Sequence, residues 1–205
     1  DQMAPDRDKW KKKSRYYYSH LESFVSFLAP ENKRVIEIGC GTGDLLFKLK
    51  PSYGLGVDIS EKMVELARQK NSNSRIEFKI GSVDDIEGLF DYIILTDLIG
   101  FLPDIEEFFR KLSRIMHPQS KLIITQYSQL WEPVLNLASS AGLRTPTPFV
   151  QNWISLADIN NFLRLTGIES VKSGKKLLFP KNIPLVSKII NNYLINLWPL
   201  SKLAL

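Results

Sequence analysis

The sequence contains a single cysteine, Cys40, among its 205 residues. One cysteine excludes an internal disulfide framework and a cysteine-rich zinc site. We expect Cys40 to be a small buried side chain rather than a reactive thiol, because free cysteines usually pack as small apolar residues.

Long hydrophobic runs are also missing. No apolar stretch reaches the roughly 18 residues of a membrane-spanning helix, and the start shows no signal-peptide pattern, so we expect a cytoplasmic location. The chain begins at Asp1 rather than at a methionine, which indicates a fragment or a trimmed form. Its length suits one α/β domain with appendages, and its 44% hydrophobic residues are ample for a packed core.

The net charge is +5, and the basic residues gather near the two ends of the chain. Solvated basic surfaces are the simplest interpretation. A surface for anionic lipid head groups or phosphorylated substrates is the sharper alternative. Nucleic acid is disfavoured as a partner, because the chain carries no recognised nucleic-acid-binding motif. The two clusters are Lys9, Lys11, Lys12, Lys13 and Arg15 near the start, and Lys172, Lys175, Lys176, Lys181 and Lys188 near the end.

The stretch 35–46, VIEIGCGTGDLL, organises the chain. It runs from a buried strand through three alternating glycines into a helical pattern, the signature of a ligand-binding turn. The spacing G-x-G-x-G is one residue shorter than the dinucleotide fingerprint, and the Lys-Ser or Lys-Thr pair of a P-loop is absent. Asp44 directly after the turn would repel a pyrophosphate, so both phosphate-binding interpretations are disfavoured.

The stretch resembles motif I of the class I S-adenosylmethionine-dependent methyltransferases, with Glu37 at the acidic strand position of that family. Asp58, Ser82 and Asp97 follow in the order that the family has. The resemblance implies an α/β fold with a Rossmann-like, doubly wound, mostly parallel sheet and helices on both faces. It also implies S-adenosylmethionine as cofactor, with S-adenosylhomocysteine as product.

Hydrophobic periodicity predicts an amphipathic helix from Ser14 that ends at Pro30. It then predicts strands at 34–38, 54–59, 75–81, 90–96 and 121–125, and helices after Gly43, at 61–70 and at 104–116, the last stopped by His117 and Pro118. Ser155 is expected to cap a helix that ends at Gly167.

We divide the chain into a flexible basic N-terminus, 1–13, and a single domain, 14–205. The domain consists of an N-terminal helix (14–30), a cofactor-binding core (31–125), an acceptor-side insertion (126–167) and a C-terminal strand with an apolar helix (168–205).

The family resemblance assigns the methionine end of the cofactor to the glycine turn, the ribose to Asp58 and the adenine to the space between Ile59 and Val83. Relatives often carry an aspartate where this sequence has Ser82, so either Ser82 or Asp84 contacts the adenine. The predicted cofactor residues are Glu37, Gly39, Cys40, Gly41, Gly43, Asp58, Ile59, Ser82, Val83, Asp84, Asp97 and Leu98.

Methyl transfer needs chiefly alignment, and a general base is helpful but optional. Candidates for the base are Asp97, His20 and Tyr127. No metal is expected, because the predicted fifth strand ends in Gln-Tyr-Ser without the second acidic pair that a metal site needs. The acceptor pocket is expected to include Tyr17, Tyr127, Trp131, Asn152 and Trp153.

The Asn/Asp-Pro-Pro-Tyr signature of amino-methylating nucleic-acid enzymes is absent at 96–99. We therefore predict an oxygen acceptor on a small molecule, a sugar or a lipid-linked intermediate. The alternative is a non-catalytic scaffold protein with this fold at a membrane surface.

The C-terminal part is expected to hold a sixth strand at 168–171 and an apolar helix within 183–205. A seventh strand is either 175–179 or lies beyond Leu205, and we favour the second. The helix is interpreted as a core-packing or homodimer element, with an interfacial membrane helix as the alternative.

Overall fold

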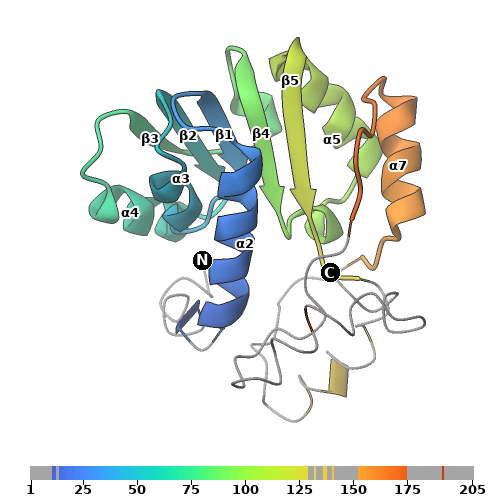
Figure 1. The fold of residues 1–205 in the computed structure, drawn as a ribbon, viewed down its shortest axis with the longest axis horizontal. Helices are drawn as coiled ribbons and strands as arrows, with labels where there is room; N and C mark the ends of the chain where they lie inside the picture. Colours follow the sequence, from blue (N-terminus) through green and yellow to red (C-terminus); the bar gives the residue numbers. More distant parts are fainter. Residues whose placement is uncertain are drawn as a thin grey trace.

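A computed structural model describes residues 11, 12, 14–128, 132, 136, 137, 140, 152–174 and 191. Its centre is a five-stranded, entirely parallel sheet in the order β3-β2-β1-β4-β5 (Figure 1). The strands are β1 (Arg34–Ile38), β2 (Tyr53–Asp58), β3 (Ile76–Ile80), β4 (Phe90–Thr96) and β5 (Met116–Thr125).

In the described part of the chain, five α-helices and three short 3₁₀ turns surround this sheet. The α-helices are α2 (Arg15–Leu28), α3 (Asp44–Leu49), α4 (Glu61–Lys70), α5 (Ile105–Leu112) and α7 (Leu156–Leu165). The 3₁₀ turns are η1 (Val83–Asp85), η2 (Ile99–Phe101) and η3 (Ser113–Ile115).

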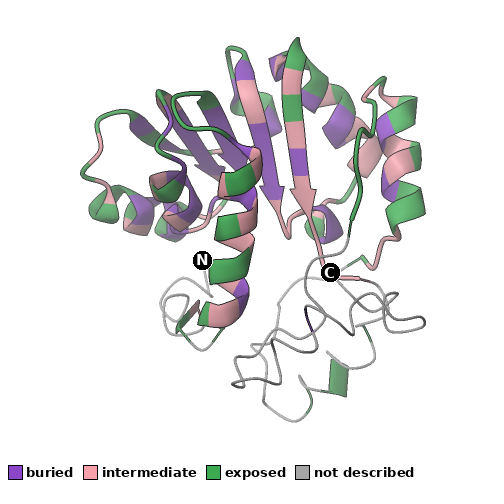
Figure 2. Cartoon of the chain, in the orientation of Figure 1, coloured by how far each residue is buried: buried purple, intermediate pink, exposed green. Residues whose placement is uncertain are grey.

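The helices cover both faces of the sheet, because successive strand residues point to opposite sides. Val35 of β1 packs with residues of α2, α3 and α4 on one face. Ile36, the next residue, packs with residues of α5 and α7 on the other. The central strands β1, β2 and β4 are therefore mostly buried, whereas the edge strands β3 and β5 and the outer faces of the helices are partly exposed (Figure 2). The predicted Rossmann-like, doubly wound fold is confirmed.

The strand order reverses at β1. The chain runs from β1 outward through β2 to β3, and then returns to β4 on the other side of β1. In open parallel sheets, ligands bind beyond the carboxyl ends of the strands at such a switch point. The glycine turn after β1, Asp58 at the end of β2 and Asp97 after β4 all lie at this edge.

Most predicted elements form where local signals are strong. The strands at 34–38 and 90–96 and the helix at 61–70 have the predicted bounds. Ser60 caps α4 by accepting from the N–H of Met63. Ser155 and Asp158 form the predicted capping box of α7.

The predicted helix 104–116 is too long. α5 ends at Leu112, and β5 already begins at Met116, so His117 and Pro118 belong to the strand rather than to a helix stop. The irregular register after the Phe90–Met116 pair lets the strand carry a proline there. The N–H of His117 donates to Oγ of Ser120, which in turn donates to the carbonyl of Phe90.

The predicted sixth strand at 168–171 is wrong: the structure describes these residues, and none of them is in a strand. Val171 is 80% exposed, and a strand needs a neighbouring ladder to satisfy its backbone. The predictions for 175–179 and for the apolar helix within 183–205 fall almost wholly outside the described residues. In the part of the chain that the structure describes, no helix is long and apolar enough to cross a membrane.

Candidate cofactor and acceptor site

The glycine turn has the backbone that the spacing predicts. Gly39, Gly41 and Gly43 have φ values of +76°, +53° and +76°, in the left-handed region that favours glycine. A Cβ on Gly43 would overlap the ring of Phe78, whereas a Cβ on Gly41 would meet nothing within 4 Å. Gly43 is therefore needed for packing, and the backbone at Gly41 borders open space that a ligand could approach.

Asp58 ties the turn to the end of β2. Its Oδ2 accepts from the N–H of Gly41 at 2.8 Å, and its Oδ1 accepts from the N–H of Ser60 at 2.9 Å. Each carboxylate oxygen can accept more than one hydrogen bond, so these contacts leave Asp58 able to accept from a ligand hydroxyl.

Glu37 is a carboxyl group enclosed beneath the turn. It is 3% exposed, and its Oε1 accepts from the hydroxyl of Thr96 at 3.1 Å. Its Oε2 is buried without a hydrogen-bond partner among the described residues. Burial raises the pKa of Glu37 to about 8, against the opposing effects of Lys11 and of the Thr96 hydroxyl. An unsatisfied buried acceptor of this kind fits a cationic ligand group that would complete its hydrogen bonding.

Tyr17, Asp97 and Tyr127 meet at the end of β4. The hydroxyl of Tyr17 donates to Oδ2 of Asp97 at 2.6 Å, and the rings of Tyr17 and Tyr127 stack with centroids 5.4 Å apart. Asp97 has a φ of +53°, which is uncommon for a residue with a side chain, and its N–H donates to the carbonyl of Thr125. Burial and the charge of Asp97 raise the pKa of Tyr17 well above its usual value, so its phenol stays protonated. The structure thus brings together three residues from three separate parts of the sequence.

On the side expected for adenine, Ile59 is 75% exposed and Val83 is buried. Ser82 caps η1, where its Oγ accepts from the N–H of Asp84. Asp84 forms an ion pair of 2.7 Å with Lys111 of α5, which holds its carboxylate toward that helix. Ser82 is engaged as well, since its N–H and its hydroxyl both donate to Oδ2 of Asp85, so both alternatives for the adenine contact stay predictions.

Cys40 and Leu98 complete the surroundings of the turn. Cys40 is buried, and burial raises the pKa of its thiol well above the usual value, in line with an inert filler. A Cβ on Gly39 would lie 3.0 Å from Cδ1 of Leu98, so that leucine packs directly on the turn.

The remaining acceptor and catalytic candidates that the structure describes lie elsewhere. His20 is exposed on α2, with its ring edge-on to Tyr16 at 4.4 Å, and is not brought to the Asp97 cluster. Trp131 is outside the described residues. Asn152 and Trp153 line a cavity of about 440 Å³ between α5 and α7, together with Leu102, Pro103, Asp104, Ile105, Glu106, Ile154, Asp158 and Phe162.

Sequence reasoning missed two residues at the turn, Lys11 and Thr42. Thr42 is completely buried, and Nζ of Lys11 donates to its Oγ1 at 3.1 Å. Lys11 falls within the predicted flexible basic N-terminus, because a lysine in a charged run carries no local signal of burial. Thr42 lies inside the glycine motif, but the spacing of the glycines predicts no role for it.

Comparison with known proteins decides the family. A family model described as "Methyltransferase domain" matches residues 30–158, which is more than half of the chain. The chain belongs to the class I S-adenosylmethionine-dependent methyltransferases. The cofactor of this family is S-adenosylmethionine. The match begins after α2 and runs from β1 to the start of α7, so it covers the whole parallel sheet.

Individual relatives agree with this assignment. YqeM of Bacillus subtilis, which carries the name of a methyltransferase, is 26% identical over 121 residues, 54% of this chain and 49% of that protein. A demethylmenaquinone methyltransferase of Lactococcus lactis is 26% identical over 127 residues, 57% of this chain and 50% of that protein. The chain thus spans about half the length of the curated relatives it matches.

Solved structures share the fold. An S-adenosylmethionine-dependent methyltransferase of Thermotoga maritima superposes with a TM-score of 0.73 at 22% identity, over 89% of this chain and 86% of that chain.

Proposed function

We propose that this chain transfers the methyl group of S-adenosylmethionine to a hydroxyl oxygen of a small-molecule, sugar or lipid-linked acceptor. The observation that carries the proposal is the cluster of Tyr17, Asp97 and Tyr127 at the carboxyl edge of the sheet, next to the glycine turn. The name of the Lactococcus relative, which points to a quinone precursor, supports a small-molecule acceptor.

The proposed cofactor site uses groups that fit its parts. The buried, unpartnered Oε2 of Glu37 suits the ammonium of the methionine end, and the open side of Gly41 leaves room for that end. Asp58 would accept from the ribose hydroxyls, and the exposed Ile59 would cover one face of the adenine opposite Val83. Ser82 or Asp84 would hydrogen-bond to the edge of the adenine, and Leu98 would lie against the turn.

When bound, the cofactor supplies an activated methyl group on a sulfonium, so the protein has mainly to align an acceptor in line with it. Tyr17 and Asp97 would together remove the proton from the acceptor hydroxyl. Because Tyr17 already donates to Asp97, its oxygen can accept from an acceptor hydroxyl while Asp97 takes the phenolic proton. Such proton transfer contributes typically about 10²- to 10⁴-fold to a rate.

Cofactor binding by calorimetry is the first test. S-adenosylmethionine should bind, and NAD should not. Asp58→Ala should weaken binding at least tenfold, because it removes the ribose acceptor and the tether to Gly41. Glu65→Ala, which changes an exposed acid on α4, is the matched control and should bind as the parent chain does. Binding of NAD alone, or unchanged affinity in Asp58→Ala, would refute the proposed site.

Transfer itself is tested by incubating the chain with methyl-labelled cofactor and metabolite or lipid extracts, then identifying the labelled atom in the product. Asp97→Asn should lower the transfer rate by about two orders of magnitude or more. Label on nitrogen or carbon would overturn the oxygen assignment. Cofactor binding without transfer to any extract would favour the scaffold alternative.

We further propose a cytoplasmic protein that contacts membranes at most peripherally, through residues 183–205. Flotation with anionic liposomes, using the chain with and without residues 181–205, tests this. Flotation that requires the segment supports membrane contact, and a concentration-dependent dimer that requires it supports a homodimer instead.

A further inference from the structure

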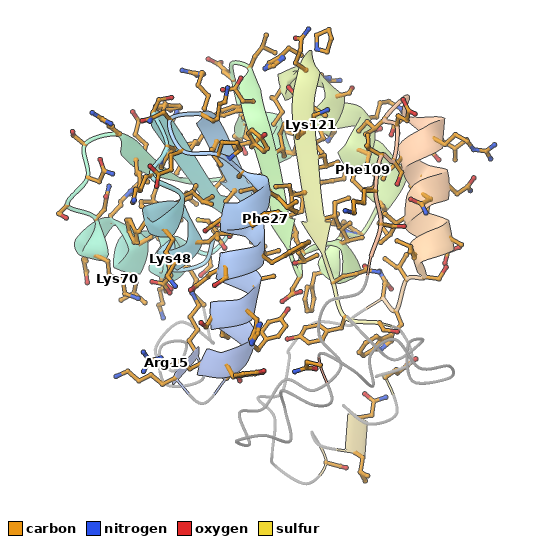
Figure 3. All side chains as sticks on the ribbon, viewed as in Figure 1. Arg15, Phe27, Lys48, Lys70, Phe109 and Lys121 are labelled. Atoms are coloured by element: carbon orange, nitrogen blue, oxygen red, sulfur yellow. The ribbon has the colours of Figure 1, made fainter. Side chains whose placement is uncertain are left out.

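Lys11, from the basic N-terminal segment, lies on the glycine turn rather than in solvent. Its Nζ donates to Oγ1 of Thr42 at 3.1 Å and to Oδ2 of Asp44 at 2.5 Å. It also lies 5.6 Å from the ring centroid of Tyr18. The side chain is 18% exposed, whereas the adjacent Lys12 is exposed, as is Arg15, which extends away from the sheet at the start of α2 (Figure 3).

Charged groups of both signs surround the turn. Asp44 lies between two ammonium groups, since Nζ of Lys70 is 3.7 Å from its other carboxylate oxygen. Burial favours the neutral form of Asp44, but the hydrogen bond and the charge of Lys11 outweigh it and hold its pKa below the ordinary value. Asp58 adds a second carboxylate at the turn, because it accepts from the N–H of Gly41, so two ammonium groups face two carboxylates there. Glu37 adds little negative charge at neutral pH, because its pKa lies at about 8.

The ammonium of Lys11 has one N–H group that the contacts to Thr42 and Asp44 do not use. A lysine ammonium carries three N–H groups, and the contacts to Thr42 and Asp44 use two of them. The third can therefore donate to an anionic group that enters the space beside Gly41, where a Cβ would meet no atom within 4 Å.

The methionine end of the cofactor carries one ammonium and one carboxylate. An ammonium beside Glu37 favours the ionised form of that side chain, and an ionised Glu37 repels the carboxylate, so the carboxylate needs a separate cation. We infer that Lys11 binds the carboxylate of the methionine end of S-adenosylmethionine. This inference rests on the cofactor placement proposed above, and it assigns part of the basic N-terminus to the cofactor site instead of to a lipid or nucleic-acid surface.

The competing explanation is that Lys11 only fastens the N-terminal segment to the fold through Asp44. The two explanations differ in the ligand group that they affect. If Lys11 binds the carboxylate, its loss weakens the binding only of molecules that have the amino-acid end. If Lys11 only anchors the N-terminal segment, its loss weakens the binding of every ligand of the site alike.

Calorimetry on the full chain can separate them with two ligands. S-adenosylhomocysteine has the amino-acid end, and 5′-methylthioadenosine has the same nucleoside and sulfur without it. Lys11→Met should weaken S-adenosylhomocysteine binding about 10- to 100-fold, the effect of losing one hydrogen bond to a charged group. Binding of 5′-methylthioadenosine should change less than about twofold. Lys12→Met, the matched control, should change neither, and Lys11→Arg should keep most of the affinity because it keeps the charge.

An equal loss for both ligands in Lys11→Met would show a fastening role and overturn the inference, as would no loss for either. Partial unfolding of Lys11→Met would lower its apparent affinity for both ligands by the same factor. The ratio of the two affinities, measured on the same variant, is therefore unaffected by it. If the parent chain fails to bind S-adenosylhomocysteine, the cofactor placement itself is wrong. If the parent chain binds and Lys11→Met binds equally well, only the assignment of Lys11 is wrong.

Discussion

Glu37 gives the sharpest test of the site, because its burial makes the stability of the fold depend on pH. Burial raises its pKa from 4.5 to about 8. Between these values the unfolded chain has lost the proton while the folded chain retains it. The stabilisation from the raised pKa is therefore fully present below pH 4.5 and is lost as the pH rises to about 8.

The magnitude follows from the size of the shift. Each pH unit in this window lowers the ratio of folded to unfolded chain about tenfold through this group alone, and the whole shift corresponds to about 5 kcal/mol. Glu37→Gln replaces the carboxyl group with a neutral amide of similar shape that can still accept from Thr96. The variant should lack this part of the pH dependence.

The assay is urea unfolding of the cofactor-free parent chain and of Glu37→Gln at pH 5.5, 6.5 and 7.5. From pH 5.5 to pH 7.5 the parent chain should lose about 3 kcal/mol of unfolding free energy relative to Glu37→Gln. Glu65→Gln, an exposed acid on α4, should follow the parent chain at every pH. Parallel profiles for the parent chain and Glu37→Gln would show that Glu37 is ionised in the fold, and the reasoning about its burial would fail.

Three further predictions concern the same site and its scaffold. Binding of S-adenosylhomocysteine at pH 7 should release close to one proton, because an ammonium beside Glu37 favours the ionised form of that side chain. Calorimetry in buffers of different ionisation enthalpy measures the number of protons released. No proton release would contradict the ammonium contact. Gly43→Ala should cost about 3 kcal/mol in urea unfolding, because of its positive φ and the ring of Phe78, whereas Gly41→Ala should cost about 1 kcal/mol and mainly weaken cofactor binding. Equal losses of unfolding free energy in Gly43→Ala and Gly41→Ala would show that the Phe78 ring can move aside for the new methyl group. Ser155→Ala should remove the cap of α7, with a loss of about 1 kcal/mol and a fall of a few degrees in Tm in calorimetric scans; an unchanged Tm would show that the cap is redundant.

Local chemistry explains where sequence reasoning on the fold succeeded and where it failed. Ser60 and Ser155 begin their helices through their own hydroxyl groups, so the sequence alone places those starts. The end of α5 was harder to predict. The apolar pattern continues past Leu112, and the pairing of Met116 with Phe90, a tertiary contact, makes the next residues a strand.

The sequence by itself determined the glycine turn, the parallel α/β order and the acidic positions at the carboxyl edge. These depend on backbone sterics and on hydrophobic periodicity, which act over a few residues. The tertiary structure alone decided which side chains meet there. Tyr17 reaches Asp97 across 80 positions of sequence, and Lys11 reaches Thr42 across 31. Tyr17 belongs to α2, which packs on the face formed by β1 and β4, and no local pattern in the sequence encodes either that packing or the contact of Lys11.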